Sequence, residues 1–188
     1  MKKGKLLFLI AILFSIVSVQ AQDQAEMMKK WQEYMTPGPM HAELAKMAGN
    51  WKAEITQYAG GQEMKAEGTA VFEMILGGRY LKSSFKTEFM GMPMEGFGLD
   101  AYDNQSKEFV SVWLDNFGTG VLVLKGSYDP AAKTITYIGN TFDPMSGKEI
   151  KMKNVNHIVD ENKTVNDMYN IVDGKEVKSM SITYTRVK

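Results

Sequence analysis

The chain has 188 residues, a length that suits one domain of ordinary size. With 44% hydrophobic residues it can bury a core without metal ions or disulfides. It has no cysteine, which excludes disulfides, thiolate zinc sites, iron–sulfur clusters, a cysteine nucleophile and a cysteine-linked lipid anchor. The formal charge is zero, and beyond the first few residues no basic block indicates nucleic-acid binding.

The first 21 residues have the pattern of a secretory signal peptide. Lysines near the start are followed by an apolar segment over 6–17, which is too short for a comfortable membrane span. Val19 and Ala21 are small residues at the −3 and −1 positions of a cleavage site. We therefore predict cleavage after Ala21, a periplasmic or secreted location, and no stable membrane insertion of the mature chain. The alternative is an uncleaved N-terminal anchor, which Ser15, Ser18 and Gln20 disfavour.

Two short helices are predicted next. Apolar residues recur at three- and four-residue spacing over 22–36, and Pro37-Gly38-Pro39 ends that helix. A second helix over 40–48 carries Leu44 and Met47 on its apolar side and has Gly49 as its C-terminal cap. The predicted organisation is a signal peptide (1–21), an N-terminal helix and linker (22–39), and one domain (40–188).

From Trp51 onward, alternating runs are separated by turn signals at nearly even spacing. About nine turns imply about ten strands, and since no helical stretch is long enough for a parallel crossover, neighbouring strands should pair antiparallel. The predicted strands are 50–59, 62–76, 79–90, 94–102, 107–115, 119–128, 133–142, 148–159, 163–172 and 176–187.

The predicted fold class is all-β, an antiparallel up-and-down β-barrel with short N-terminal helices. A meander of long strands leaves two exposed edges unless it closes into a barrel. A barrel of this size holds one small ligand or is filled by its own side chains, and the sequence leaves both open. It also leaves open which face of the strand over 107–115 points inward, because both faces are apolar.

Two features resemble known families. Gly49-Asn50-Trp51, after a short helix, resembles the G-x-W signature of lipocalins, in which an arginine from the last strand often packs over the tryptophan. The resemblance implies that Arg186, with Tyr184 on the same face, stacks on Trp51 and closes one end of the barrel, an interaction of roughly 0.5–2 kcal/mol.

The second resemblance covers nearly all of 39–188. It rests on five segments in order: residues 44–51, Gly77-Gly78-Arg79-Tyr80-Leu81, residues 90–96, Tyr102-Asp103-Asn104, and residues 143–148. Together they resemble the bacterial family called domain of unknown function 1579. The resemblance implies a lipocalin-like barrel, close in shape to fatty-acid-binding proteins, and implies no established activity and no catalytic residues.

Four residues are candidates for contact with a ligand. Arg79 follows a Gly-Gly turn and would hold a carboxylate or another anion through its two-pronged guanidinium if it projects into the barrel. Trp113, Tyr169 and Tyr184 would line a cavity, although aromatic residues at strand spacing are more often plain core. For Arg79 the alternative is a rim arginine paired with a carboxylate.

Metal and haem sites are lesser alternatives. The Met90-Gly91-Met92-Pro93-Met94 array has thioethers suited to Cu(I), but methionines also serve as adaptable apolar filler. His157 lies in a predicted strand and would serve as a lone haem ligand if it faced an apolar cavity. His41 is expected at the surface or as a helix cap, and two histidines so far apart make no zinc site. We therefore predict no metal and no cofactor.

The sequence contains neither a nucleophile elbow nor a phosphate-binding loop. The predicted function is non-enzymatic binding of a small hydrophobic or amphipathic ligand in the barrel, with no catalytic residues. The alternatives are a filled barrel that acts as a structural or protein-interaction module, and an enzyme. An enzyme would need buried polar groups with strongly perturbed pKa values inside the barrel. The sequence does not indicate an oligomeric state.

Overall fold

The computed structural model describes residues 23–89, 91–144 and 146–188. The predicted signal peptide and Met90 of the methionine array lie outside these residues. The chain divides into two compact units after Thr36. The first contains a helix over 23–35, as predicted, which leaves Met27, Met28 and Trp31 more than half exposed. No helix in the described segments is long and apolar enough to cross a membrane.

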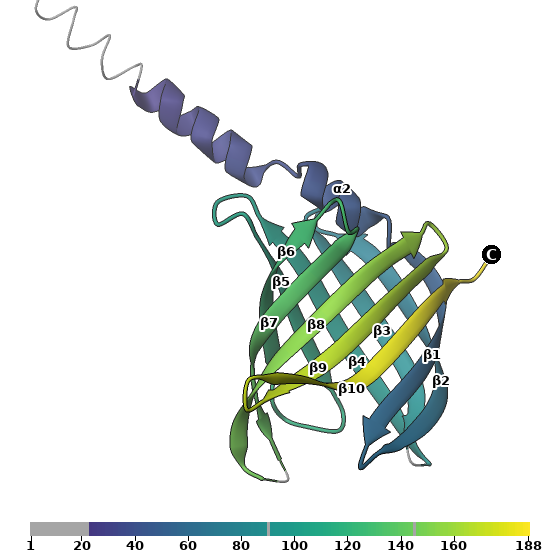
Figure 1. Cartoon of the computed structure of the whole chain (residues 1–188). Helices are drawn as coiled ribbons and strands as arrows, with labels where there is room; N and C mark the ends of the chain where they lie inside the picture. The colour runs from purple at the N-terminus through teal and green to yellow at the C-terminus, as the bar shows by residue number, and fades with distance from the viewer. Residues whose placement is uncertain (1–22, 90, 145) are drawn as a thin grey trace, which may run out of the picture. The chain divides into compact units, whose positions relative to one another are not determined.

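The second unit, Pro37–Lys188, contains one short helix and ten strands (Figure 1). In chain order they are α2 (Pro39–Ala45), β1 (Gly49–Ala59), β2 (Gln62–Ile75), β3 (Tyr80–Phe89), β4 (Met92–Asp103), β5 (Glu108–Asp115), β6 (Leu122–Asp129), β7 (Thr134–Asp143), β8 (Lys148–Asp160), β9 (Lys163–Val172) and β10 (Lys175–Arg186). Most strand ends lie within one or two residues of the prediction. β6 begins three residues later than predicted, after Gly118 and Gly120, which have no side chain to pack.

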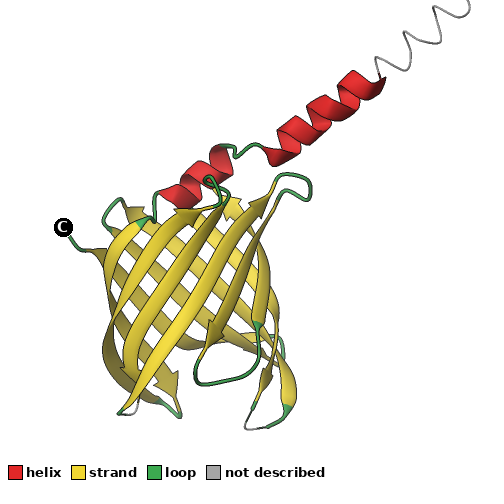
Figure 2. Cartoon of the chain, turned by 180° about the vertical axis from the view of Figure 1, so that it is seen from behind, coloured by secondary structure: helices red, strands yellow, loops and turns green. Residues whose placement is uncertain are grey.

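The ten strands form a closed barrel in which every strand pairs antiparallel with its neighbours in sequence (Figure 2). β1 completes the ring by pairing with β10 on one side and with β2 on the other. The predicted up-and-down barrel is therefore confirmed. Each of the strands in the described residues therefore has a neighbour on both sides, and alternate residues of each strand face the inside of the barrel.

Helix α2 covers one end of the barrel, which we call the α2 end. Leu44 is buried against Leu81, Phe109 and Leu124, and Met47 packs against the same cluster. The helix ends earlier than the prediction of 40–48, because the N–H groups of residues 46–48 bond carbonyls three residues back and so tighten the last turn.

His41 lies within α2 and is buried, with 6% of its surface exposed, so the expectation of a surface position is wrong. Its Nδ1 atom accepts a hydrogen bond from the Gly38 N–H at 3.0 Å, and its ring packs edge-on against Tyr102. Burial lowers the pKa of His41 below its usual value. The histidine therefore acts as a neutral helix cap at this end of the barrel.

Arg186 and Trp51 face each other across the β1–β10 closure. The guanidinium carbon lies 4.2 Å from the centre of the fully buried Trp51 ring system. The same guanidinium donates to the carbonyls of Lys46 and Ala48, both at 2.6 Å, and of Glu161 at 2.9 Å. Gly49 has a φ of 136°, and a Cβ atom there would lie 2.5 Å from Arg186 Nη1, so this position requires glycine.

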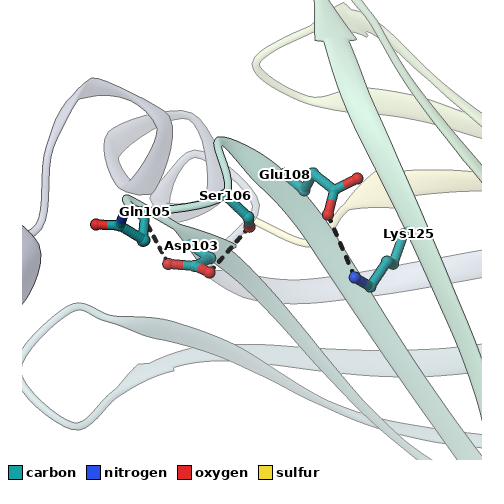
Figure 3. A network of polar contacts seen from close by, with 5 residues as sticks. All are labelled: Asp103, Gln105, Ser106, Glu108 and Lys125. Atoms are coloured by element: carbon teal, nitrogen blue, oxygen red, sulfur yellow. Dashed lines mark hydrogen bonds and ion pairs between the residues drawn. The ribbon is translucent and has the colours of Figure 1, made fainter.

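The turn between β4 and β5 is held by Asp103 (Figure 3). One carboxylate oxygen accepts from the Gln105 N–H at 2.8 Å, and the other accepts from the Ser106 hydroxyl at 2.9 Å. The hydrogen bond from Gln105 is the main cause that lowers the pKa of Asp103. On the strands that follow, Lys125 of β6 pairs with Glu108 of β5 at 3.3 Å. This exposed pair adds little to stability.

Replacing Asp103 by alanine is expected to lower the free energy of unfolding by about 1 kcal/mol, because the turn loses both acceptors. Asp103→Asn is the matched control, since an asparagine side chain keeps one acceptor for the Gln105 N–H and should lose about half as much. Urea unfolding followed by circular dichroism measures both variants. Equal stability of the alanine variant and the natural chain would contradict this role for the turn.

Candidate ligand cavity

The barrel encloses a cavity of about 970 Å³. Alternation along each strand decides which side chains face it: Phe85 and Trp113 face inward from β3 and β5, and Met168 and Ile182 from β9 and β10. The cavity extends from Leu44 and Met47 at the α2 end to Phe89, Gly91 and Phe117 near the turns at the other end, which we call the far end. The interior of the barrel is therefore not filled by its own side chains.

One wall of the cavity is shaped by two glycines in β4. Gly96 and Gly98 face inward, and a Cβ atom at Gly96 would overlap the ring of Trp113. A Cβ atom at Gly98 would overlap the Ser83 hydroxyl. The indole lies in the space that the glycines leave, edge-on to Phe85 at 5.9 Å, and its N–H donates to Asp115 at 2.8 Å. The strand over 107–115 thus turns Phe109, Ser111 and Trp113 inward.

Asp100 is a carboxyl group deep inside the barrel. It faces Leu81 and Ser111 on the neighbouring strands, and its remaining accessible surface borders the cavity instead of the outer solvent. Burial raises the pKa of Asp100 to about 6, while interactions with the Ser111 and Tyr137 hydroxyls act in the opposite direction. Loss of hydration disfavours the charged form of such a group, so Asp100 changes charge near neutral pH.

Three polar side chains that line the cavity leave part of their hydrogen-bonding capacity unused. Tyr137 is almost fully buried and lies close to Asp100. Burial, together with the negative charge of Asp100, raises the pKa of Tyr137 well above its usual value. Its hydroxyl nevertheless makes no hydrogen bond of good geometry to any described residue. The side-chain oxygens of Asn154 and Asn166 are also buried without a partner in that part of the chain. Buried polar atoms in this state are uncommon and indicate a binding partner or solvent.

The other charged residues that border the cavity have outside partners or lie at its ends. They are Glu43, Lys65, Glu67, Glu88 and Asp115. Glu67 pairs with Lys52 outside the barrel, and Glu43 pairs with Lys46 on α2. Asp115 accepts hydrogen bonds from Trp113 and from the Phe117 N–H near the far end. Lys65 and Glu88 occupy strand positions that alternate with inward-facing residues.

Of the four residues predicted to contact a ligand, the structure brings Trp113 and Tyr184 together at the cavity. Arg79 and Tyr169 do not line it. Arg79 lies in the turn before β3, where its guanidinium donates to the Leu76 carbonyl at 3.1 Å. Tyr169 follows the inward-facing Met168 and therefore points outward, with the ammonium groups of Lys153 and Lys178 at 5.7 and 5.4 Å from its ring centre.

The residues considered for haem and copper are separated from the cavity or only partly described. His157 is not among the cavity residues, and its Nε2 atom lies 3.7 Å from Asp167. Met94 borders the cavity, whereas Met92 is half exposed. In residues 23–89, 91–144 and 146–188, no three histidine, aspartate or glutamate side chains gather as a metal site would require.

Sequence reasoning missed the polar residues of the site, namely Asp100, Ser111, Tyr137, Asn154 and Asn166. For Asp100 a signal was present, because it alternates with outward-facing Leu99 and follows Gly96 and Gly98 on the same face. A charged residue at an inward position of an otherwise apolar barrel marks a site. This signal could not be recognised from the sequence alone, because the register of the strands determines which residues face the inside of the barrel.

Comparison with models of known protein families identifies the family to which the chain belongs. The model of a protein family described as a protein of unknown function, DUF1579, matches residues 36–186. The chain belongs to this family. The match covers α2 and all ten strands, so the resemblance predicted from the sequence is confirmed, and the family description brings no activity with it. No curated protein matches the chain.

Two solved structures share the barrel of this DUF1579 protein. Rv2717c from M. tuberculosis is 14% identical with a TM-score of 0.61, over 81% of this chain and all of the other. The S-type phycobiliprotein lyase CPES from Guillardia theta is 10% identical with a TM-score of 0.57, over 83% of this chain and 96% of the other. At these identities the likeness establishes the fold alone.

Proposed function

We propose that this protein is secreted and binds a small amphipathic molecule non-covalently inside its barrel, without chemical conversion. The observation that carries the proposal is the cavity of about 970 Å³, whose wall is mainly apolar and contains Asp100 with the Ser111 and Tyr137 hydroxyls beside it. Ligand sites in proteins typically have volumes of about 300–1,000 Å³ and a few placed polar groups. The barrel shared with the phycobiliprotein lyase is a fold compatible with the binding of a small ligand.

Native mass spectrometry of the protein purified from its own organism tests the proposal. The expected result is a complex whose added mass is released on denaturation, together with a chain mass that corresponds to residues 22–188. The added mass identifies the class of ligand, and the chain mass tests cleavage after Ala21. A protein that carries nothing, and that also fails to bind a neutral apolar fluorophore, would contradict ligand binding. A full-length chain mass would contradict the signal peptide.

A cavity-filling variant tests where the ligand lies. Met168 faces the cavity from β9, so Met168→Trp should fill part of it and weaken ligand binding at least about tenfold by steric overlap. Val165→Trp is the matched control, because Val165 is on the outward face of the same strand. Fluorescence titration with a neutral apolar fluorophore measures both variants. Equal weakening in the two variants would place the ligand outside the barrel.

Acid–base chemistry on the bound molecule is a second candidate function, and one observation favours it. Asp100 and Tyr137 are buried together at the cavity, and both have raised pKa values. Incubation of the protein with the ligand found by mass spectrometry separates the two functions. An unchanged ligand supports a carrier, whereas a product that disappears in the Asp100→Asn variant supports an enzyme.

A further inference from the structure

The sign of the charge inside the barrel points to a class of ligand. We propose that the cavity selects amphipathic molecules whose head group is a cationic amine over those whose head group is a carboxylate, and that Asp100 receives this head group. The inference rests on the proposed function and narrows it. It differs from the expectation for Arg79, which would hold an anion if it projected into the barrel, because Arg79 lies in a turn and does not line the cavity.

One carboxyl group inside the cavity has no opposite charge beside it. Among the described residues that border the cavity, Lys65, Glu67 and Glu88 alternate with inward-facing residues, and Glu43 and Asp115 have partners at the two ends, which leaves Asp100. Lys65 lies between Met64 and Ala66, which face the cavity, so its place in β2 is on the outer face. Asp100 therefore has no cation facing it from the cavity wall. A carboxylate ligand would bring a second negative charge to this site, and like charges in a poorly hydrated space repel strongly.

The unpaired polar atoms near Asp100 indicate that the head group binds at this depth. Tyr137 has 2% of its surface exposed, and its hydroxyl lies beside Asp100 but makes no hydrogen bond of good geometry in the described part of the chain. Asn154 faces Tyr137 across the β7–β8 pair, and its side-chain oxygen is likewise unpaired. A hydroxyl donates or accepts, and an amide can turn over, so these groups adapt to either kind of head group. Asp100 is therefore the group that determines which charge of the head group is favoured.

The apolar parts of the cavity leave room for the rest of the ligand. Tyr137 packs in the cluster that includes Leu44 of α2, which places the polar groups toward the α2 end. Toward the far end the wall is formed by Phe89, Met94 and Phe117. A molecule whose amine lies at Asp100 would therefore direct its alkyl chain toward the far end, where apolar contacts stabilise it at roughly 0.8 kcal/mol per buried methylene group.

Three probes of equal chain length test the selection: decylamine, 1-decanol and decanoic acid. Each displaces N-phenyl-1-naphthylamine, a neutral fluorophore, from the natural protein at pH 7.5. The expected order of affinity is amine, alcohol, acid, with the amine at least about tenfold tighter than the acid, since one charge–charge contact changes sign between them. In Asp100→Asn this ratio should fall below about threefold, because the fixed charge is gone.

Glu95→Gln is the matched control. Glu95 lies on the same strand, faces outward and pairs with Lys86 at 2.9 Å, so the variant removes one carboxylate without touching the cavity. Its amine-to-acid ratio should equal that of the natural chain, because salt screens a charge on the outer surface. Decanoic acid that binds as tightly as decylamine, or an amine preference that persists in Asp100→Asn, would overturn the inference and leave the carrier function standing. If the neutral fluorophore itself does not bind, the proposed function fails and this inference fails with it.

Discussion

Replacing Arg186 by alanine is expected to lower the free energy of unfolding by about 3 kcal/mol, because one side chain joins three parts of the chain. Its guanidinium stacks on Trp51 at 4.2 Å and donates to carbonyls of the α2–β1 connection and of the β8–β9 turn. Stacking contributes about 1 kcal/mol of this loss, and the hydrogen bonds from a charged donor contribute the remainder. Urea unfolding followed by circular dichroism measures the change.

Arg186→Lys separates charge from geometry. Lysine keeps the positive charge but lacks the planar guanidinium that donates to three carbonyls and stacks on the indole, so about two-thirds of the loss should remain. Lys188→Ala is the matched control, because Lys188 is also a basic residue near the C-terminus but is exposed and lies outside the strands. Full recovery of stability in Arg186→Lys would show that charge alone matters. A loss below about 1 kcal/mol in Arg186→Ala would contradict the role of this residue in closing the barrel.

The barrel could be predicted from the sequence because its strands follow local rules. Turn residues such as Gly60-Gly61 and Asp173-Gly174 take up positive φ values, and the runs between them alternate clearly. Closure also followed from physical reasoning, since a meander of ten long strands without it would expose two edges. These features depend on neighbours in sequence, which the sequence displays directly.

The site could not be predicted in the same way, because it depends on which residues face each other across strands. Tyr169 and Met168 are adjacent in sequence and face opposite sides of β9, so a choice between them needs the register. Arg79 has the strand parity of the inward-facing Leu81 and Ser83, but it precedes the strand and bends back to the Leu76 carbonyl. Asp100 meets Tyr137 because β4 and β7, which are not neighbours in the ring, both direct these side chains into the interior of a closed barrel.

The charge of Asp100 predicts an unusual dependence of stability on pH. The pKa of Asp100 is about 6 in the folded protein, against an ordinary value of 3.8 that an unfolded chain would show. Between these two values the folded state holds more protons than the unfolded state, so the free energy of unfolding falls as pH rises through this window. Above pH 7 the full cost is present, up to about 3 kcal/mol for a shift of this size. The Asp100→Asn variant should therefore be more stable than the natural chain by about 1–3 kcal/mol at pH 7.5, and the difference should shrink to well below about 1 kcal/mol near pH 4.

The difference in the free energy of unfolding between the natural chain and Asp100→Asn separates the effect of Asp100 from that of other groups that titrate in this pH range. Burial lowers the pKa of His41, which makes stability rise with pH and so opposes the effect of Asp100, but both proteins contain this histidine. Tyr137 and Tyr184, the titratable neighbours of Asp100, have raised pKa values and stay neutral from pH 4 to 8. Urea unfolding at half-unit steps of pH measures the difference, with Glu95→Gln as the control that should leave the Asp100 transition in place. A difference in the free energy of unfolding that is constant across pH would mean that Asp100 keeps an ordinary pKa. Its carboxylate would then be well hydrated at neutral pH, and burial would not favour the binding of a cationic partner.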